Sequence, residues 1–242
     1  MKFTKALNWR NLFFELVIVF IGILAALQVD DYRQQQAFEQ AQYRYLARLN
    51  EDLKLYLDST ESTLKLLIDI RDAMEHVWDS LQAGEVIDGD RKTFEFGLIY
   101  LGHLPSNPLP RSAYDEMVAS GMFSSLESIE LQSAISKLFS THAFMESNFT
   151  WWRENVLYDE RHMDTLVDFY DDPGESVDRG ALFAEPSRRV SFDLKVLAAD
   201  REFRNGIYWA RDTRSDWVEW NTLLRNEVLQ AMKLLEAELE RP

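Results

Sequence analysis

Near its N-terminus the chain carries an unbroken run of apolar positions, residues 12–29, in which Glu15 and Gln28 are the only strongly polar side chains. A helix rises about 1.5 Å per residue, so this run would span roughly 27 Å, close to the hydrocarbon thickness of a bilayer. The run ends without the alternating small residues of a signal-peptidase site. We therefore expect residues 12–29 to form an uncleaved transmembrane helix in contact with membrane lipid.

After residue 29 the apolar positions recur every three or four residues, which is the pattern of helices with one buried face. Residues 30–45 are polar and contain neither Gly nor Pro, so the helix is expected to continue out of the bilayer as a stalk. Apolar stripes then predict further helices, separated by turn-forming stretches rich in Gly, Pro and Asp. The stripes cover residues 46–81, 91–104, 112–122, 128–156 and 200–240, and residues 181–199 fit either a strand or a helix start.

The predicted fold class is all-α, with an N-terminal transmembrane helix that continues into a stalk and an extramembrane helical bundle over residues 46–242. Two serines are placed to cap helices. Ser112 precedes one helix, with Glu116 near the capping-box position and Gly121 at the expected end. Ser128 precedes the next and most regular stripe.

Charges on either side of the apolar run predict its orientation. Basic residues precede the run and acidic residues follow it directly, namely Lys2, Lys5 and Arg10 before it and Asp30 and Asp31 after it. Because cytoplasmic flanks of membrane helices are enriched in Lys and Arg, residues 1–11 are expected in the cytoplasm. In a bacterium the helix would cross the inner membrane, and the bulk of the chain would be periplasmic.

The rest of the chain is strongly acidic. The chain has 26 basic and 41 acidic residues, and the first 29 positions contain three of the basic and one of the acidic residues. The remaining 23 basic and 40 acidic residues give the rest of the chain a formal net charge of -17. Nucleic acids are bound through Lys and Arg, and no nucleic-acid partner is expected. The chain has no Cys, which excludes disulfides, thiolate metal sites and Cys nucleophiles.

Glu15 is out of place in an apolar run. On a helix, Asn11, Glu15, Gly22 and Ala26 share one face, and Gly22 and Ala26 form a small-xxx-small pair that lets helix backbones approach closely in lipid. One interpretation is that Glu15 reaches the nearby membrane interface. Another is that this face forms a helix–helix contact with identical chains or with a partner, and a proton or ion path is a third.

Three segments carry a resemblance to a known family. They are ELVIVFIGILAALQVDDYRQ at 15–34, YLARLNEDL at 45–53 and AYDEMVASGMF at 113–123. Together they resemble an uncharacterised bacterial family of single-span membrane proteins, classed as a domain of unknown function, with a GILIALQINNWNE-like anchor. The family typically has Gly before the Glu and Asn-Asn-Trp where the apolar run ends. This sequence has Phe14 before Glu15 and Asp30-Asp31-Tyr32 at the end of the run. The resemblance implies the fold and topology, with Glu15, Gly22 and Gln28 at typical positions, and implies no activity.

Motifs for catalysis and cofactor binding were sought and not found. The sequence contains no G-x-S-x-G, no G-x-x-x-x-G-K and no H-E-x-x-H. The densest group of candidate metal ligands, YDERHMD at 158–164, would be spread around a helix rather than converge, so it is interpreted as a solvated charged stretch. We expect no catalytic residues, no cofactor and no metal site, and therefore a protein that is not an enzyme.

A histidine and a pair of tryptophans are the remaining candidates for a functional contact. His142 lies alone on the apolar stripe of 128–156, where a hydrogen-bonded core histidine is the default and a pH switch or ligand contact the alternative. Adjacent Trp151 and Trp152 point about 100° apart on a helix, so one of them could face a partner or the membrane surface. Arg211 and Arg214 alternate with acidic residues and are interpreted as an ion-paired surface.

Two functions follow from these features. The first is a non-enzymatic, membrane-anchored helical scaffold or accessory subunit that forms a homo-oligomer or binds other membrane protein subunits. The alternative is a periplasmic sensor or ligand-binding module with a pocket near His142 and the Trp clusters.

Overall fold

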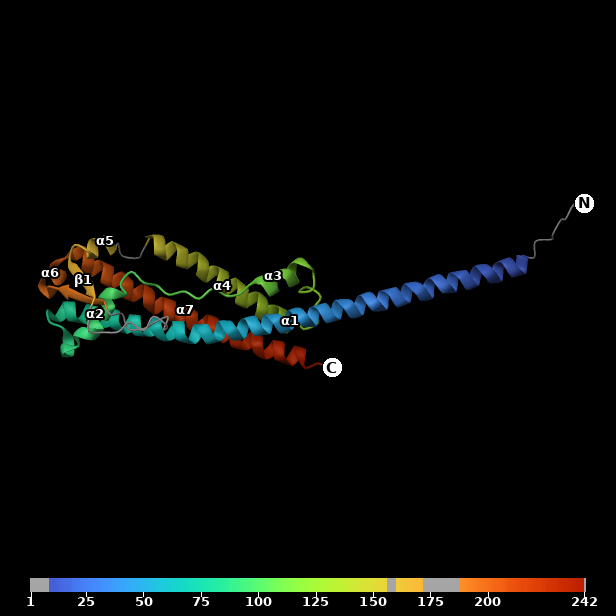
Figure 1. Ribbon diagram of the computed structural model, residues 1–242, viewed down its shortest axis with the longest axis horizontal. Helices are drawn as coiled ribbons and strands as arrows, with labels where there is room; N and C mark the ends of the chain where they lie inside the picture. Colours follow the sequence, from blue (N-terminus) through green and yellow to red (C-terminus); the bar gives the residue numbers. More distant parts are fainter. Residues whose placement is uncertain (1–8, 156–159, 172–187, 242) are drawn as a thin grey trace, which may run out of the picture.

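A single helix, α1, runs from Trp9 to Ala83 and forms both an isolated N-terminal arm and one side of a helical bundle (Figure 1). The computed structural model describes residues 9–155, 160–171 and 188–241. Helix α1 contains one Gly and no Pro, so nothing in its backbone interrupts the hydrogen-bond ladder over about 110 Å. It ends at Gly84, whose φ of +77° is accessible to Gly at little strain.

The other elements fold back along the second half of α1, and α7 returns toward the arm, so the C-terminus lies near the point where the arm leaves the bundle (Figure 1). In chain order they are the 3₁₀ helix η1 (Ile87–Gly89), α2 (Arg91–Ile99), α3 (Ser112–Ala119), α4 (Ile129–Asn155), α5 (Glu160–Met163), the strands β1 (Val167–Asp171) and β2 (Arg188–Phe192), α6 (Leu194–Ala199) and α7 (Arg201–Leu239). The predicted helical class is confirmed, with one two-stranded sheet added to it.

The bundle holds two adjoining hydrophobic cores. The core nearer the arm packs residues 46–67 of α1 against α3, α4 and the second half of α7. The distal core packs residues 66–81 of α1 against α2, α5, the β1–β2 hairpin, α6 and the first half of α7. Both cores lie along α1 and α7, and these two helices therefore carry the fold.

The helix starts are set by side-chain caps, with one difference from expectation. Ser128 Oγ accepts the Leu131 N–H at 3.2 Å, as the sequence predicts. The predicted capping box at Ser112 is wrong: Ser112 is the first helical residue, and its hydroxyl accepts a bond from Arg48 at 2.8 Å. Arg48 also pairs with Glu116 at 3.3 Å, so both predicted capping groups instead join α3 to α1.

The ambiguous region after residue 187 contains both strand and helix. Strand β2 pairs antiparallel with β1, with Val190 opposite Phe169. The hairpin is held to α2 by the buried carboxylate of Glu95, which contacts Arg91 at 2.6 Å and Arg189 at 3.6 Å. Sequence periodicity could not place this strand, because its conformation depends on pairing with β1 rather than on its own pattern.

Helices α1 and α2 approach each other closely at Gly97. A Cβ at this position would lie 2.6 Å from Val77 Cγ2 and 3.0 Å from the Ala73 carbonyl oxygen. We expect Gly97→Ala to lower the free energy of unfolding by about 1–3 kcal/mol, because overpacking outweighs the better helix propensity of Ala. Chemical denaturation of the bundle measures the change. Gly22→Ala is the matched control, since a Cβ there meets nothing within 4 Å; a Gly97→Ala protein as stable as this control would contradict the prediction.

Candidate functional site

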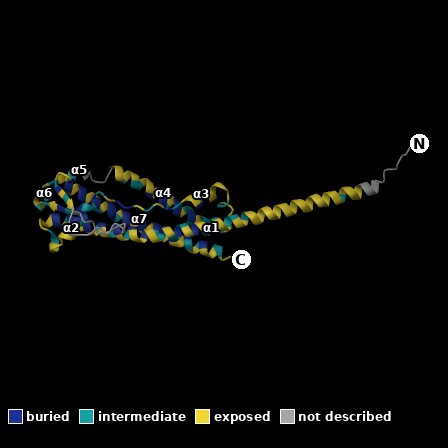
Figure 2. Cartoon of the chain, in the orientation of Figure 1, coloured by how far each residue is buried: buried dark blue, intermediate teal, exposed yellow. Residues whose placement is uncertain are grey.

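The arm formed by the first part of α1 exposes its apolar side chains on all sides (Figure 2). Eleven of the twelve large apolar residues from Phe13 to Val29 are 46% to 68% exposed, and Val17 is partly exposed. A helix of the core of a soluble protein would bury such residues, whereas none of the most apolar window of α1 is buried. Among the described residues, one helix is therefore long and apolar enough to cross a membrane, as an anchor or a signal.

Of the four residues predicted to share a face on this arm, Glu15 is exposed and Gly22 has open space above its Cα. Ala26 is exposed as well, and the side chain of Asn11 lies outside the described residues. The arm remains isolated up to Gln42, whose amide donates to the Met122 carbonyl oxygen at 3.1 Å. No described part of the bundle covers this face, which is available to lipid or to another helix.

His142 is buried in the core nearer the arm. Its side chain comes from α4, and Nε2 accepts the backbone N–H of Leu109 at 3.1 Å. A ring nitrogen that accepts carries no proton, so the neutral ring has its proton on Nδ1. Burial lowers the pKa of His142 most, and the nearby Arg111 lowers it further, whereas the Glu146 carboxylate and a hydrogen bond with the Asn107 backbone raise it. The net direction is downward, so the neutral form is favoured.

The low pKa of His142 predicts a loss of stability in acid. Below the pKa of a free histidine, about 6.5, the unfolded chain binds a proton that the folded chain does not, so the free energy of unfolding falls by up to about 1.4 kcal/mol per pH unit. The loss continues until the pH reaches the lowered pKa of the folded state. Denaturation between pH 7 and 5 measures this slope. His142→Gln should flatten it and His76→Gln, at the bundle surface, should not; equal slopes in all three proteins would contradict the prediction.

The connection between α2 and α3 is not helical, and side-chain hydrogen bonds join it to the neighbouring helices. Asn107 donates to the Tyr56 carbonyl oxygen at 3.3 Å and to two hydroxyls of α1. Trp217 Nε1 donates to the Pro105 carbonyl oxygen at 3.0 Å. Because a buried backbone group without a partner is unfavourable, these contacts and the one from His142 hold the connection in the groove between α1, α4 and α7.

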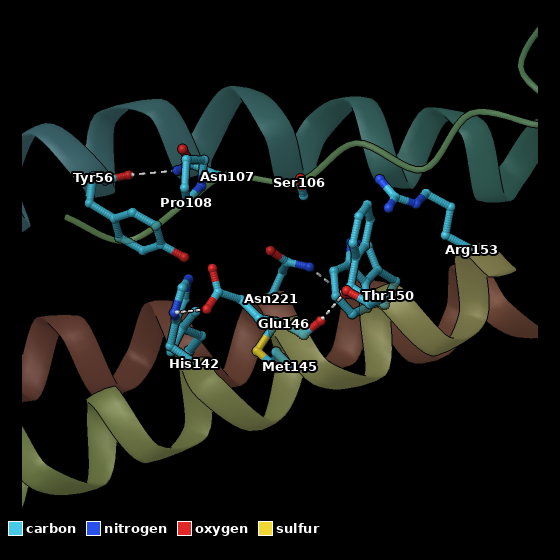
Figure 3. A pocket seen from close by; sticks show the side chains of 13 residues that line it. Tyr56, Ser106, Asn107, Pro108, His142, Met145, Glu146, Thr150, Arg153 and Asn221 are labelled. Carbon is cyan, nitrogen blue, oxygen red and sulfur yellow. Dashed lines mark hydrogen bonds and ion pairs between the residues drawn. The ribbon is translucent and has the colours of Figure 1, made fainter. Parts of the chain in front are cut away.

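A cavity of about 260 Å³ lies beside this connection (Figure 3). Its wall comes from α1, α4, α7 and residues 106–108. Polar side chains line it at Tyr56, His142, Glu146, Arg153 and Asn221. Aromatic and aliphatic side chains, among them Phe149 and Trp217, form the rest of its surface. Burial raises the pKa of Tyr56 to about 12, so its hydroxyl is protonated at neutral pH.

The adjacent tryptophans of α4 have different surroundings, and neither lines this cavity. Trp152 stacks on Trp220 with ring centroids 5.0 Å apart and meets Trp217 at 5.6 Å. Trp151 is 54% exposed on another side of α4. Phe144 lies two turns before Trp151 on α4. It is also exposed, and its ring centroid lies 5.3 Å from that of Trp220. We call Phe144, Trp152 and Trp220 the aromatic face of α4 and α7.

Arg214 was interpreted as a surface residue, and this interpretation is wrong. Its side chain is 0% exposed, and its guanidinium donates to the carbonyl oxygens of Tyr100, Leu101 and His103, just after the end of α2. Burial lowers its pKa to about 10, so it stays cationic at neutral pH. The carbonyl-rich C-terminal end of α2 carries partial negative charge and offsets the buried cation. Arg211, in contrast, does form a surface pair, with Glu75 at 3.4 Å.

These carbonyl contacts also account for the end of α2. The apolar pattern predicts a helix over 91–104, but α2 ends at Ile99. After it, the Tyr100 carbonyl oxygen accepts from Arg214 and from the His103 N–H in a turn, and the Leu101 carbonyl oxygen accepts from Arg214. The sequence contains an indication that Arg214 is buried, because this residue lies on the apolar stripe of α7 between Ala210 and Trp217.

The charged stretch YDERHMD provides no metal site in the part of the chain that the structure describes. Tyr158 and Asp159 lie outside the described residues. His162 in α5 contacts Asp200, the N-cap of α7, at 3.1 Å. The carboxylate of Asp200 accepts the Phe203 N–H at 2.7 Å, which together with His162 keeps its pKa below the usual range. The pair therefore joins α5 to the start of α7.

No protein-family model matches the chain, and no curated protein or solved structure is significantly similar to it. The resemblance of its anchor to a family of single-span membrane proteins stays a prediction.

Proposed function

We propose that the protein is a non-enzymatic scaffold or accessory subunit, anchored in a bilayer by residues 12–29, that oligomerises or joins a larger membrane complex. The observation that carries the proposal is the continuity of α1. One helix includes an arm with exposed apolar side chains on all sides and then forms a central element of both cores. An apolar arm of this kind is stable only in lipid or against another membrane-embedded helix.

The flanking charges support an orientation with the N-terminus in the cytoplasm and the bundle in the periplasm of a bacterium. The stalk between Asp30 and Gln42 would hold the bundle about 18 Å away from the hydrocarbon core. A reporter fused to the C-terminus tests this orientation: a periplasmic reporter should be active, and activity of a cytoplasmic reporter would overturn it.

Two surfaces favour assembly over a monomeric role. In the arm, Gly22 and Ala26 leave room for a second helix backbone, and the exposed Glu15 is more stable facing protein than acyl chains. On the bundle, the aromatic face presents large apolar side chains of the type that dominate protein interfaces. No described part of the chain covers the small-residue face of the arm, and on the aromatic face Phe144 is 60% exposed.

Crosslinking of the full-length chain in native membranes tests the assembly role. We expect either a homo-oligomer of defined mass or one reproducible membrane protein partner, retained through purification in mild detergent. Ala26→Ile places a bulky side chain on the small-residue face and should weaken that product at least several-fold. Ala25→Ile adds the same volume about 100° away and is the control. A strictly monomeric chain without a partner would overturn the proposal.

A further inference from the structure

The inner end of the cavity contains a hydrogen-bond donor that has no acceptor. His142 is only 3% exposed, and its Nδ1 has no hydrogen-bond partner among the described residues. Glu146 Oε2 lies 3.6 Å from Nδ1, which is beyond hydrogen-bond distance. A buried N–H without an acceptor costs about 1–3 kcal/mol. A bound group that accepts this proton would remove that penalty.

The groups around His142 restrict what this acceptor can be. A carboxylate would accept from Nδ1–H but would lie against the Glu146 carboxylate, which is about half exposed on the same wall. An ammonium would pair with Glu146 but would present only donors to Nδ1–H. A hydroxyl can accept from Nδ1–H and donate to Glu146 at the same time. The protonated hydroxyl of Tyr56 points to the same place (Figure 3).

The remainder of the cavity is suited to a molecule with several hydroxyls on an apolar ring. Asn221 and Arg153 place an amide and a guanidinium along the wall beyond Glu146 (Figure 3). Phe149 and Trp217 contribute aromatic surface between these polar groups. Glu146 and Arg153 have opposite charges, so the lining has no net charge that would favour an ion. The volume of about 260 Å³ exceeds by far the roughly 15 Å³ that one water needs, and is close to the lower end of small-molecule pockets, about 300 Å³.

We infer that this cavity is a binding site for a small neutral polyhydroxylated molecule of about monosaccharide size, with one hydroxyl bridging His142 Nδ1–H and Glu146. The site lies in the extramembrane bundle and is independent of the assembly role proposed above. Its recognition residues come from α1, α4 and α7, so binding also stabilises the packing of these helices around the connection between α2 and α3.

Binding is tested on the full-length protein in phosphatidylcholine nanodiscs, which avoids detergents with sugar headgroups. The probes are D-glucose, D-galactose, D-mannose and myo-inositol at millimolar concentration, with butylamine and butyrate as charged comparisons. Saturation-transfer NMR should detect at least one polyol, and titration calorimetry then gives its dissociation constant. No signal from any of the four polyols would overturn the inference, as would tighter binding of butylamine or butyrate.

Variants separate this site from adventitious surface binding. Glu146 is exposed enough for Glu146→Ala to fold, and we expect it to weaken polyol binding at least tenfold. Glu154→Ala removes an equally exposed carboxylate from the same helix outside the cavity, and should leave the dissociation constant unchanged. His142→Gln, with folding checked by circular dichroism, should also weaken binding at least tenfold. Unchanged affinity in Glu146→Ala, or an equal loss in Glu154→Ala, would overturn the inference.

Discussion

Removal of residues 1–29 is expected to transfer the protein from the membrane fraction to the soluble fraction while the bundle stays folded. Eleven of the twelve large apolar side chains between residues 13 and 29 are exposed, and each contributes roughly -0.3 to -0.6 kcal/mol to insertion at the centre of a membrane helix. Together they outweigh the single Glu15 near the end of the run. The first core residue of α1 is Leu46, so the deletion removes nothing from either core. Carbonate extraction of membranes and thermal unfolding followed by circular dichroism measure the two effects.

The control for this deletion replaces residues 12–29 with an unrelated helix of Leu and Ala of the same length. It should restore the membrane fraction, because anchoring depends on apolar surface and length rather than on particular side chains. The same replacement removes Glu15 and Gly22, so it also separates anchoring from assembly. A full-length chain that is soluble and monodisperse without any amphiphile would contradict the anchoring role.

Arg214→Ala is expected to cause the largest loss of stability of any single substitution in the bundle, about 3–5 kcal/mol in the free energy of unfolding. The substitution removes the donor to three carbonyl groups after α2 and leaves a cavity in a region with 0% exposure. Arg214→Lys keeps the charge but has one donating nitrogen instead of a planar fork, so it should recover only part of the stability. Chemical denaturation of the three proteins under identical conditions measures the series.

Arg225→Ala provides a matched control on the same helix. Arg225 pairs with Glu61, and both side chains are at least one-third exposed, so its loss should change stability by less than about 1 kcal/mol. If Arg214→Ala were no more destabilising than Arg225→Ala, the carbonyl contacts of Arg214 would not hold the end of α2 in solution.

Local patterns in the sequence determined the features that depend on short-range chemistry. The apolar run of 12–29, the polar stalk and the three-and-four spacing of the long stripes predict α1, α4 and α7, because helical hydrogen bonds join residues only four positions apart. Ser128 as a cap and Gly121 with positive φ follow from the same short-range rules. The position of His142 on an apolar stripe also indicated its burial before its partners were known.

Only the tertiary structure decided which polar groups meet across the bundle. Arg214 lies about 110 positions from the carbonyl groups it contacts, and His142 receives its hydrogen bond from Leu109, 33 positions away. Likewise, β2 acquires its conformation from pairing with β1, and α2 stops where its carbonyls turn to another helix. The spacing of apolar residues does not predict such contacts. They arise from the way α1 and α7 are packed rather than from the conformational preference of any one segment. The cavity beside His142 exists for the same reason, as the space left where three helices enclose a connection that is not helical.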